Sequence, residues 1–140
     1  GKTVRWKLDN DFSVEGYSFM TVVHPSAVVA LDVKLSEGVQ VMAGSVIQPG
    51  VEIGRATIIN TKVSIDHDCD IGEYCHIAPG VTMSGDVTVG KNVHIGTGSS
   101  VTQGITISDH AIVGAGSLVY KDVNRGVQLL QERNDRITVR

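Results

Sequence analysis

Large aromatic side chains and cysteines are scarce in this chain. Aromatic residues make up only 4% of the 140 residues, and there are two cysteines. Two cysteines cannot form the disulfide framework that holds many small extracellular domains together. With few rings, the apolar 41% of the chain is mainly aliphatic. Such side chains fill only a narrow core, and the β-branched ones among them favour strands over helices.

The chain also lacks an excess of positive charge and long apolar runs. Its formal net charge is −3, which argues against a nucleic-acid partner. No apolar stretch is long enough to cross a bilayer, and the opening GKTVRWKLDN lacks the apolar centre of a signal peptide. We therefore expect a cytoplasmic protein with no nucleic-acid or membrane partner.

What the chain does contain is an unbroken six-residue repeat. Seventeen positions, each six residues after the previous one, are all aliphatic: Val23, Val29, Leu35, Val41, Ile47, Ile53, Ile59, Ile65, Ile71, Ile77, Met83, Val89, Ile95, Val101, Ile107, Val113 and Val119. The fourth residue of most hexads is Gly, Asp or Asn, which tolerate left-handed backbone angles and so predict a corner. A period of six excludes an α-helix, because it spreads the apolar residues around the whole helix surface.

Three hexads close a triangular coil of eighteen residues. Coils stack at the strand spacing of about 4.8 Å, so the repeat predicts an all-β triangular prism of about 5–6 coils, about 27 Å long. We expect this parallel β-helix over residues 23–123, between an N-terminal extension (1–22) and a C-terminal tail (124–140). The extension could hold a strand or a short helix that covers one open end. In the tail, QLLQER could be a helical turn and RITVR a strand.

The eighteen-residue period also predicts which polar residues are neighbours. His67 lies near a corner, and Gly85 follows it by eighteen, so no side chain stacks against His67 on that side. His94 follows His76 by eighteen, which places these two rings in adjacent coils. Of the remaining histidines, His24 and His110 have the character of ordinary surface residues.

Five segments carry a resemblance to a known family: HPSAVV at 24–29, VMAGSVIQPG at 41–50, INTKVSIDHDCDIGEYCHIAPG at 59–80, SGDVTVGKNVHIG at 84–96 and IVGAGSLVYKDV at 112–123. They resemble the hexapeptide-repeat acyltransferases, in particular the sialic acid and nucleotide-amino-sugar acetyltransferases of the bacillosamine and perosamine type. The resemblance covers about a hundred residues. It implies a left-handed β-helix, a homotrimer with active sites between subunits, and a small sugar acceptor.

The same resemblance implies roles for two adjacent residues. His67 would be the general base that takes a proton from an amine or hydroxyl as that group attacks the thioester of acetyl-CoA. A neutral imidazole titrates near pH 6.5, which suits this role. Asp68 would raise its basicity, but neighbours on a flat strand point to opposite faces, so the corner must turn Asp68 toward the ring. Asp66 is a second candidate.

The resemblance also implies contacts with acetyl-CoA at His76, at Gly85 and at the backbones of Thr97 and Ala115. No side chain resembles an activated nucleophile, which favours direct transfer. Cys69 and Cys75 occupy inward positions, and we expect inert core thiols.

A metal site is the alternative that this prism raises, because γ-class carbonic anhydrases build a zinc site from three interfacial histidines. Their pattern includes an H-x4-H pair. This sequence has none, so we expect no metal.

Two departures from the resembled family leave alternatives open. Relatives usually carry a preceding α/β domain that binds the sugar nucleotide, whereas here RWKLDNDFSVEGYSFMTVVHPSA resembles only the tail of one, as in a truncated or a minimal natural form. Relatives also follow the prism with G-x-P-A-[KR], where this chain has NRGVQLLQERND. An acetyltransferase is therefore one hypothesis, and a structural or regulatory trimeric prism without catalysis is the other.

Overall fold

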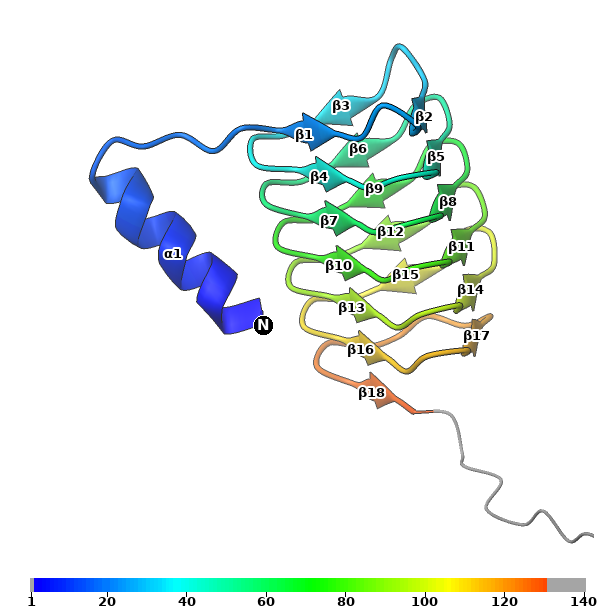
Figure 1. The fold of residues 1–140 in the computed structure, drawn as a ribbon. Coiled ribbons are helices and arrows are strands. Elements are labelled where there is room, and N and C mark those ends of the chain that lie inside the picture. Colours follow the sequence, from blue (N-terminus) through cyan, green and yellow to red (C-terminus); the bar gives the residue numbers. More distant parts are fainter. Residues whose placement is uncertain (1, 131–140) are drawn as a thin grey trace, which may run out of the picture.

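The structure, a computed structural model, describes residues 2–130 and consists of a helix beside a triangular β-solenoid (Figure 1). Three parallel sheets form the three faces. The chain visits the sheets in turn, so within β1–β17 neighbouring strands of a sheet are three places apart in the chain, whereas β18 pairs with β16. The six-residue repeat is therefore confirmed as one strand and one corner, and eighteen residues as one coil.

The sheets, here called A, B and C, contain short strands in regular order. Sheet A consists of β1 (Val22–Val23), β4 (Gln40–Val41), β7 (Ile58–Ile59), β10 (His76–Ile77), β13 (His94–Ile95), β16 (Ile112–Val113) and β18 (Gln128–Leu129). Sheet B consists of β2 (Val28–Val29), β5 (Val46–Ile47), β8 (Ser64–Ile65), β11 (Thr82–Met83), β14 (Ser100–Val101) and β17 (Leu118–Val119). Sheet C consists of β3 (Lys34–Leu35), β6 (Glu52–Ile53), β9 (Asp70–Ile71), β12 (Thr88–Val89) and β15 (Thr106–Ile107).

The core is a column of aliphatic side chains along the axis of the prism. In each strand from β4 to β17, the second residue points inward and is at most 2% exposed. Val23, in the first coil, is 42% exposed because no further coil covers it. Burial of this column is the main stabilising term, at roughly 1.5–3 kcal/mol for each fully buried aliphatic side chain.

The corners have the left-handed backbone that the Gly, Asp and Asn residues predict. Positive φ values occur at Gly50 (+77°), Asp68 (+58°) and Asn92 (+57°), among others. Backbone hydrogen bonds join the corners of adjacent coils; the Asp68 amide, for example, donates to the Pro49 carbonyl at 3.0 Å. A corner side chain is therefore held in a fixed place relative to the coils on both sides.

The parallel sheet continues beyond residue 123. Val123 bridges Ile107, and β18 pairs with β16, both with an offset of sixteen residues instead of eighteen. The last coil is two residues shorter, which takes β18 out of the six-residue register. The predicted helical turn in QLLQER is wrong at Gln128 and Leu129, which form β18. The RITVR segment lies outside the described residues.

The N-terminal extension forms helix α1 (Lys2–Val14), but the expectation that it covers an open end is wrong. The helix lies alongside the stack (Figure 1). Its Arg5 guanidinium donates to the Ala56 carbonyl at 2.7 Å, and its Asp9 carboxylate accepts two 2.8 Å hydrogen bonds from Arg55. The Tyr74 hydroxyl also donates to Asp9. These partners lie at corners between sheets C and A, which explains the lateral position of the helix.

Within the described residues, no helix has both the length and the apolar character needed to span a membrane.

Candidate active site

The candidate site is the corner that connects β8 to β9, where the chain passes from sheet B to sheet C. His67 and Asp68 are its two turn residues. The left-handed φ of Asp68 turns its side chain back, and Asp68 Oδ2 lies 2.9 Å from His67 Nδ1. The condition for contact between these neighbours is thus met. A carboxylate only accepts, so Nδ1 carries the ring hydrogen and Nε2 carries the lone pair.

The surroundings of His67 are acidic. The hydrogen bond that His67 donates to Asp68 raises the pKa of the imidazole above its ordinary value, and the charges of Asp66 and Asp86 act in the same direction against a desolvation effect. Asp66 does not bond the ring; its Oδ1 accepts the His67 backbone N–H at 2.8 Å. Of the two carboxylates considered from the sequence, Asp68 is therefore the ring partner and Asp66 fixes the backbone.

Gly85 occupies the equivalent corner position one coil later, as the spacing predicts. A Cβ placed on Gly85 would lie 2.6 Å from both Cε1 and Nε2 of His67. The Cε1–Nε2 edge of the imidazole therefore lies against the bare backbone of Gly85, which is buried. No hydrogen bond to Nε2 is found within residues 2–130, and the His67 side chain is 52% exposed. Within the described residues, the lone pair of Nε2 therefore remains available to a ligand.

His76 and His94 lie elsewhere, on the outer face of sheet A. They are register partners in β10 and β13, with ring centroids 5.0 Å apart, so the predicted stacking is confirmed. Asn60, which follows β7, lies 3.1 Å from His76 Nε2 through its side-chain nitrogen. Its oxygen accepts the Thr61 amide at 2.7 Å, which sets the amide orientation and makes His76 Nε2 the acceptor.

Thr97 and Ala115 lie at successive corners between sheets A and B. Both are exposed, and the Thr97 carbonyl accepts from the Gly116 amide at 2.8 Å. The backbone amides of Thr97 and Ala115 donate no backbone hydrogen bond within the described chain. The same is true of Gln103, the equivalent residue at the corner between β14 and β15. The six residues expected at the site thus form two groups on one chain, with sheet B between them.

The thiols of Cys69 and Cys75 are in the core, as expected from their position. Each is at most 1% exposed. Cys69 Sγ donates to the Ser84 carbonyl at 3.2 Å, and Cys75 Sγ donates to the Gly90 carbonyl at 2.9 Å. Burial raises the pKa of the Cys69 thiol, which disfavours a reactive thiolate.

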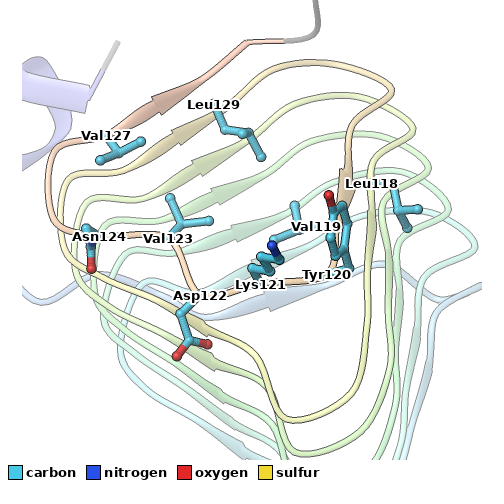
Figure 2. A pocket seen from close by; sticks show the side chains of 9 residues that line it. All are labelled: Leu118, Val119, Tyr120, Lys121, Asp122, Val123, Asn124, Val127 and Leu129. Carbon is cyan, nitrogen blue, oxygen red and sulfur yellow. The ribbon is translucent and has the colours of Figure 1, made fainter.

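Three hollows in the surface all lie away from His67. One of about 240 Å³ lies at the C-terminal end of the prism, where Val123 and Leu129 point inward (Figure 2). One of about 140 Å³ separates α1 from the solenoid near Arg5, and an open one of about 410 Å³ crosses sheet C near Lys34. Within residues 2–130, no three His, Cys, Asp or Glu side chains are grouped to hold a metal ion.

Several solved structures are similar to this one. A histidine-to-asparagine variant of perosamine N-acetyltransferase from Caulobacter crescentus, in complex with CoA and GDP-perosamine, superposes with a TM-score of 0.91 at 40% identity, over 93% of this chain and 62% of that one. The acetyltransferase domain of PglB from Neisseria gonorrhoeae superposes with a TM-score of 0.89 at 30% identity, over 91% and 62%. In sequence and in fold, this chain is similar to these hexapeptide-repeat sugar acetyltransferases.

A further member, WeeI from Acinetobacter baumannii, superposes with a TM-score of 0.79 at 28% identity, over 94% of this chain and 65% of that one. No protein-family model matches the chain. The chain spans less than two thirds of the length of each of these three relatives.

Proposed function

We propose that this chain transfers the acetyl group of acetyl-CoA to an amino group of a sugar nucleotide, with His67 as the general base. The observation that carries the proposal is the His67–Asp68 pair, in which the carboxylate fixes Nδ1–H and leaves the lone pair on Nε2 of a half-exposed ring. The relatives support the choice of substrates. The Caulobacter enzyme was solved with CoA and GDP-perosamine, and the PglB domain with acetyl coenzyme A.

The proposed reaction is a single displacement. The acceptor nitrogen attacks the thioester carbonyl carbon, a C–N bond forms, the C–S bond breaks, and CoA leaves as a thiolate that takes up a proton. His67 Nε2 accepts the proton that the nitrogen loses, and the negative Asp68 stabilises the resulting imidazolium. The buried thiols Cys69 and Cys75 support direct transfer, because neither is placed to carry an acetyl group.

The acidic surroundings favour an amine over a hydroxyl acceptor. Asp66, Asp68 and Asp86 all raise the affinity of His67 for a proton. The same negative field attracts an amino sugar in its protonated form, which releases one proton to solvent before its neutral nitrogen attacks, whereas a neutral hydroxyl gains nothing from the field. We place the reaction in the cytoplasm, where free thiols stay reduced.

The active site is completed by two copies of the chain in this proposal. His67, Asp68 and Gly85 lie at corners between sheets B and C, whereas His76 lies on sheet A, and Thr97 and Ala115 lie at corners between A and B. A cofactor that contacts both groups must lie between one copy and its neighbour. Such a site is a property of a homotrimer, in which each interface joins the two unlike corners.

The outer faces of the sheets support this assembly. The outward strand residues of sheet C include Lys34, Glu52 and Asp70, all charged. Those of sheets A and B in the described chain carry no Lys, Arg, Asp or Glu. Interface centres are depleted of charged residues, so A and B suit contact with other copies and C suits solvent.

Acetyl-CoA consumption tests the proposal directly. The wild-type protein is incubated with acetyl-CoA and a panel of nucleotide-linked amino sugars, each matched with its hydroxyl analogue, and thiol release is followed. We expect N-acetylated product, located by mass spectrometry, from at least one amine and not from its analogue. Products from the hydroxyl sugars alone would contradict the acceptor class, and no thiol release with any sugar would favour the non-catalytic prism.

A mixing experiment tests the shared site. His67→Ala and His76→Ala remove the base and the proposed cofactor contact from opposite sides of an interface. We expect each variant to be inactive and equal, randomly mixed trimers to regain about a quarter of wild-type activity, since an intact site needs the correct chain on each side. If mixing restores no activity, or light scattering finds a monomer, the shared site is wrong.

A further inference from the structure

The corner one coil before the His67–Asp68 pair carries a glycine directly beneath the Asp68 carboxylate. A Cβ placed on Gly50 would overlap Asp68 Oδ1 and lie 3.3 Å from its Cγ. The Gly50 amide donates to Asp32 Oδ2 at 2.9 Å, and the adjacent Pro49 carbonyl accepts the Asp68 amide at 3.0 Å. The Gly50 backbone is therefore held in place by hydrogen bonds on both sides, and the Asp68 carboxylate packs directly against it.

Two glycines thus enclose the pair from opposite sides. Gly50 precedes Asp68 by eighteen residues and leaves space for its carboxylate, and Gly85 follows His67 by eighteen and leaves space for its imidazole. A side chain at either position would push one partner away from the 2.9 Å contact between Oδ2 and Nδ1.

Backbone conformation alone does not account for Gly50. Its φ is +77°, but Lys62 and Asn92 occupy corners at +57° without being glycine. Gly104 is the matched case: it lies at a corner between the same two sheets, at +71°, and a Cβ on it would meet nothing within 4 Å. Of these two glycines, only Gly50 has a neighbour that a side chain would displace.

We propose that Gly50 is a positioning residue, whose missing side chain lets Asp68 reach the imidazole of His67. The inference rests on the proposed function for its catalytic consequence, since His67 must be the base, but the geometry makes a prediction that needs no turnover. Asp66, Asp68 and Asp86 are the charged groups that act on His67, and of these only Asp68 bonds the ring. Displacing it removes the hydrogen bond that fixes the tautomer.

An NMR titration of His67 in the full chain tests the inference. The ring signals are assigned by their loss in His67→Asn, and the pKa of His67 is compared among wild type, Gly50→Ala, Gly104→Ala and Asp68→Asn. We expect the pKa to fall in Gly50→Ala and in Asp68→Asn and to be unchanged in Gly104→Ala. The double variant Gly50→Ala/Asp68→Asn should titrate like Asp68→Asn alone, because the carboxylate that Gly50 accommodates is already absent.

Folding and turnover are measured on the same variants. If Gly50→Ala does not fold, Gly50→Asn and Gly104→Asn replace the alanine pair, since asparagine already occupies a corner at position 92. We expect kcat/KM with acetyl-CoA to fall severalfold in the Gly50 variant only. Equal titration of the Gly50 and Gly104 variants would overturn the positioning role. If wild type turns over no acetyl-CoA yet the His67 pKa still falls in the Gly50 variant, the proposed function fails and the positioning role stands.

Discussion

Two corners of the same solenoid carry polar clusters that differ in almost every physical respect. At the corners between sheets C and A, Asp9 is 5% exposed and is bonded by Arg55 and Tyr74. At the corner between sheets B and C, the side chains of His67 and Asp68 are 52% and 69% exposed. The first cluster is covered and fully partnered and so fixes a segment of chain, whereas the second keeps one nitrogen open for a ligand.

The charge balance of the two clusters differs in the same sense. Arg55 lies between two carboxylates, Asp9 and Glu37, and their hydrogen bonds raise its pKa while its own bonds lower the pKa of Asp9. The charges therefore compensate within the protein. Around His67, several exposed carboxylates surround one weak base, so their charge is balanced by solvent ions, by a proton or by a cationic substrate. A buried cluster whose charges are paired within the protein indicates a structural role, and an exposed cluster whose charges are not paired indicates a functional one.

The largest expected effect comes from removing the imidazole at the exposed corner. We expect His67→Ala to lower kcat/KM about 10²–10⁴-fold, the usual contribution of a general base. Thermal stability should be unchanged, because the side chain is half exposed. Steady-state kinetics and a melting curve measure the two quantities, with His110→Ala, at an exposed corner histidine, as the control. Wild-type activity in His67→Ala would show that the exposed corner is not the catalytic site.

At the covered corner, removal of Asp9 should have the opposite profile. We expect Asp9→Ala to destabilise the docking of α1 by about 1–3 kcal/mol, because Arg55 and the buried Tyr74 hydroxyl lose their shared partner while Glu37 still pairs with Arg55. Turnover should change little, because α1 lies at corners between C and A. Trp6, the single tryptophan, reports detachment by fluorescence, and Asp11→Ala on the exposed side of the helix is the control. A docked helix in Asp9→Ala would show that Arg5 alone suffices.

The docking of α1 should also depend on pH in two separate ranges. Bonding to Arg55 lowers the folded-state pKa of Asp9, so its stabilisation is present above the ordinary carboxyl pKa and is lost as pH falls below it. Burial and the bond to Asp9 raise the pKa of Tyr74 to about 12, so its contribution is lost as pH rises from about 10 to about 12. Trp6 fluorescence should be constant between these ranges, and a transition near neutral pH would contradict this account.

The exposed corner could be predicted from the sequence and the covered one could not, for a physical reason. An unbroken register fixes which residues are stacked, so Gly85 against His67 and His76 against His94 follow from counting. The same count taken backward from Asp68 reaches Gly50. The contact between Asp9 and Arg55 joins a helix to a corner 46 residues away, and no period links them. The shortened last coil could not be predicted for a related reason, because the loss of two residues shifts β18 out of the six-residue register.

A smaller effect is expected from Asp68→Asn, which leaves the shape of the exposed corner intact. Asp68 raises the pKa of His67, so wild-type kcat/KM should rise with pH through a midpoint above the ordinary histidine value. In Asp68→Asn the midpoint should move to lower pH, because the imidazolium loses its stabilising charge. The plateau should fall roughly tenfold, the lower end of what a partner that orients a functional histidine contributes. An unchanged midpoint would show that Asp68 only packs against the ring.

The smallest expected effect tests whether burial or position in the fold makes one polar cluster more stabilising than another. Glu73 and Lys91 form a 3.1 Å ion pair at corners between C and A, the same edge that holds Asp9, but their side chains are 40% and 60% exposed. Exposed pairs contribute about 0.2–1 kcal/mol, so we expect Lys91→Met to lower the free energy of unfolding by no more than this. Denaturant unfolding of Lys91→Met and Asp9→Ala side by side measures the contrast. If both variants lost the same free energy of unfolding, the position at this edge, and not burial under α1, would determine how much a polar cluster contributes to stability.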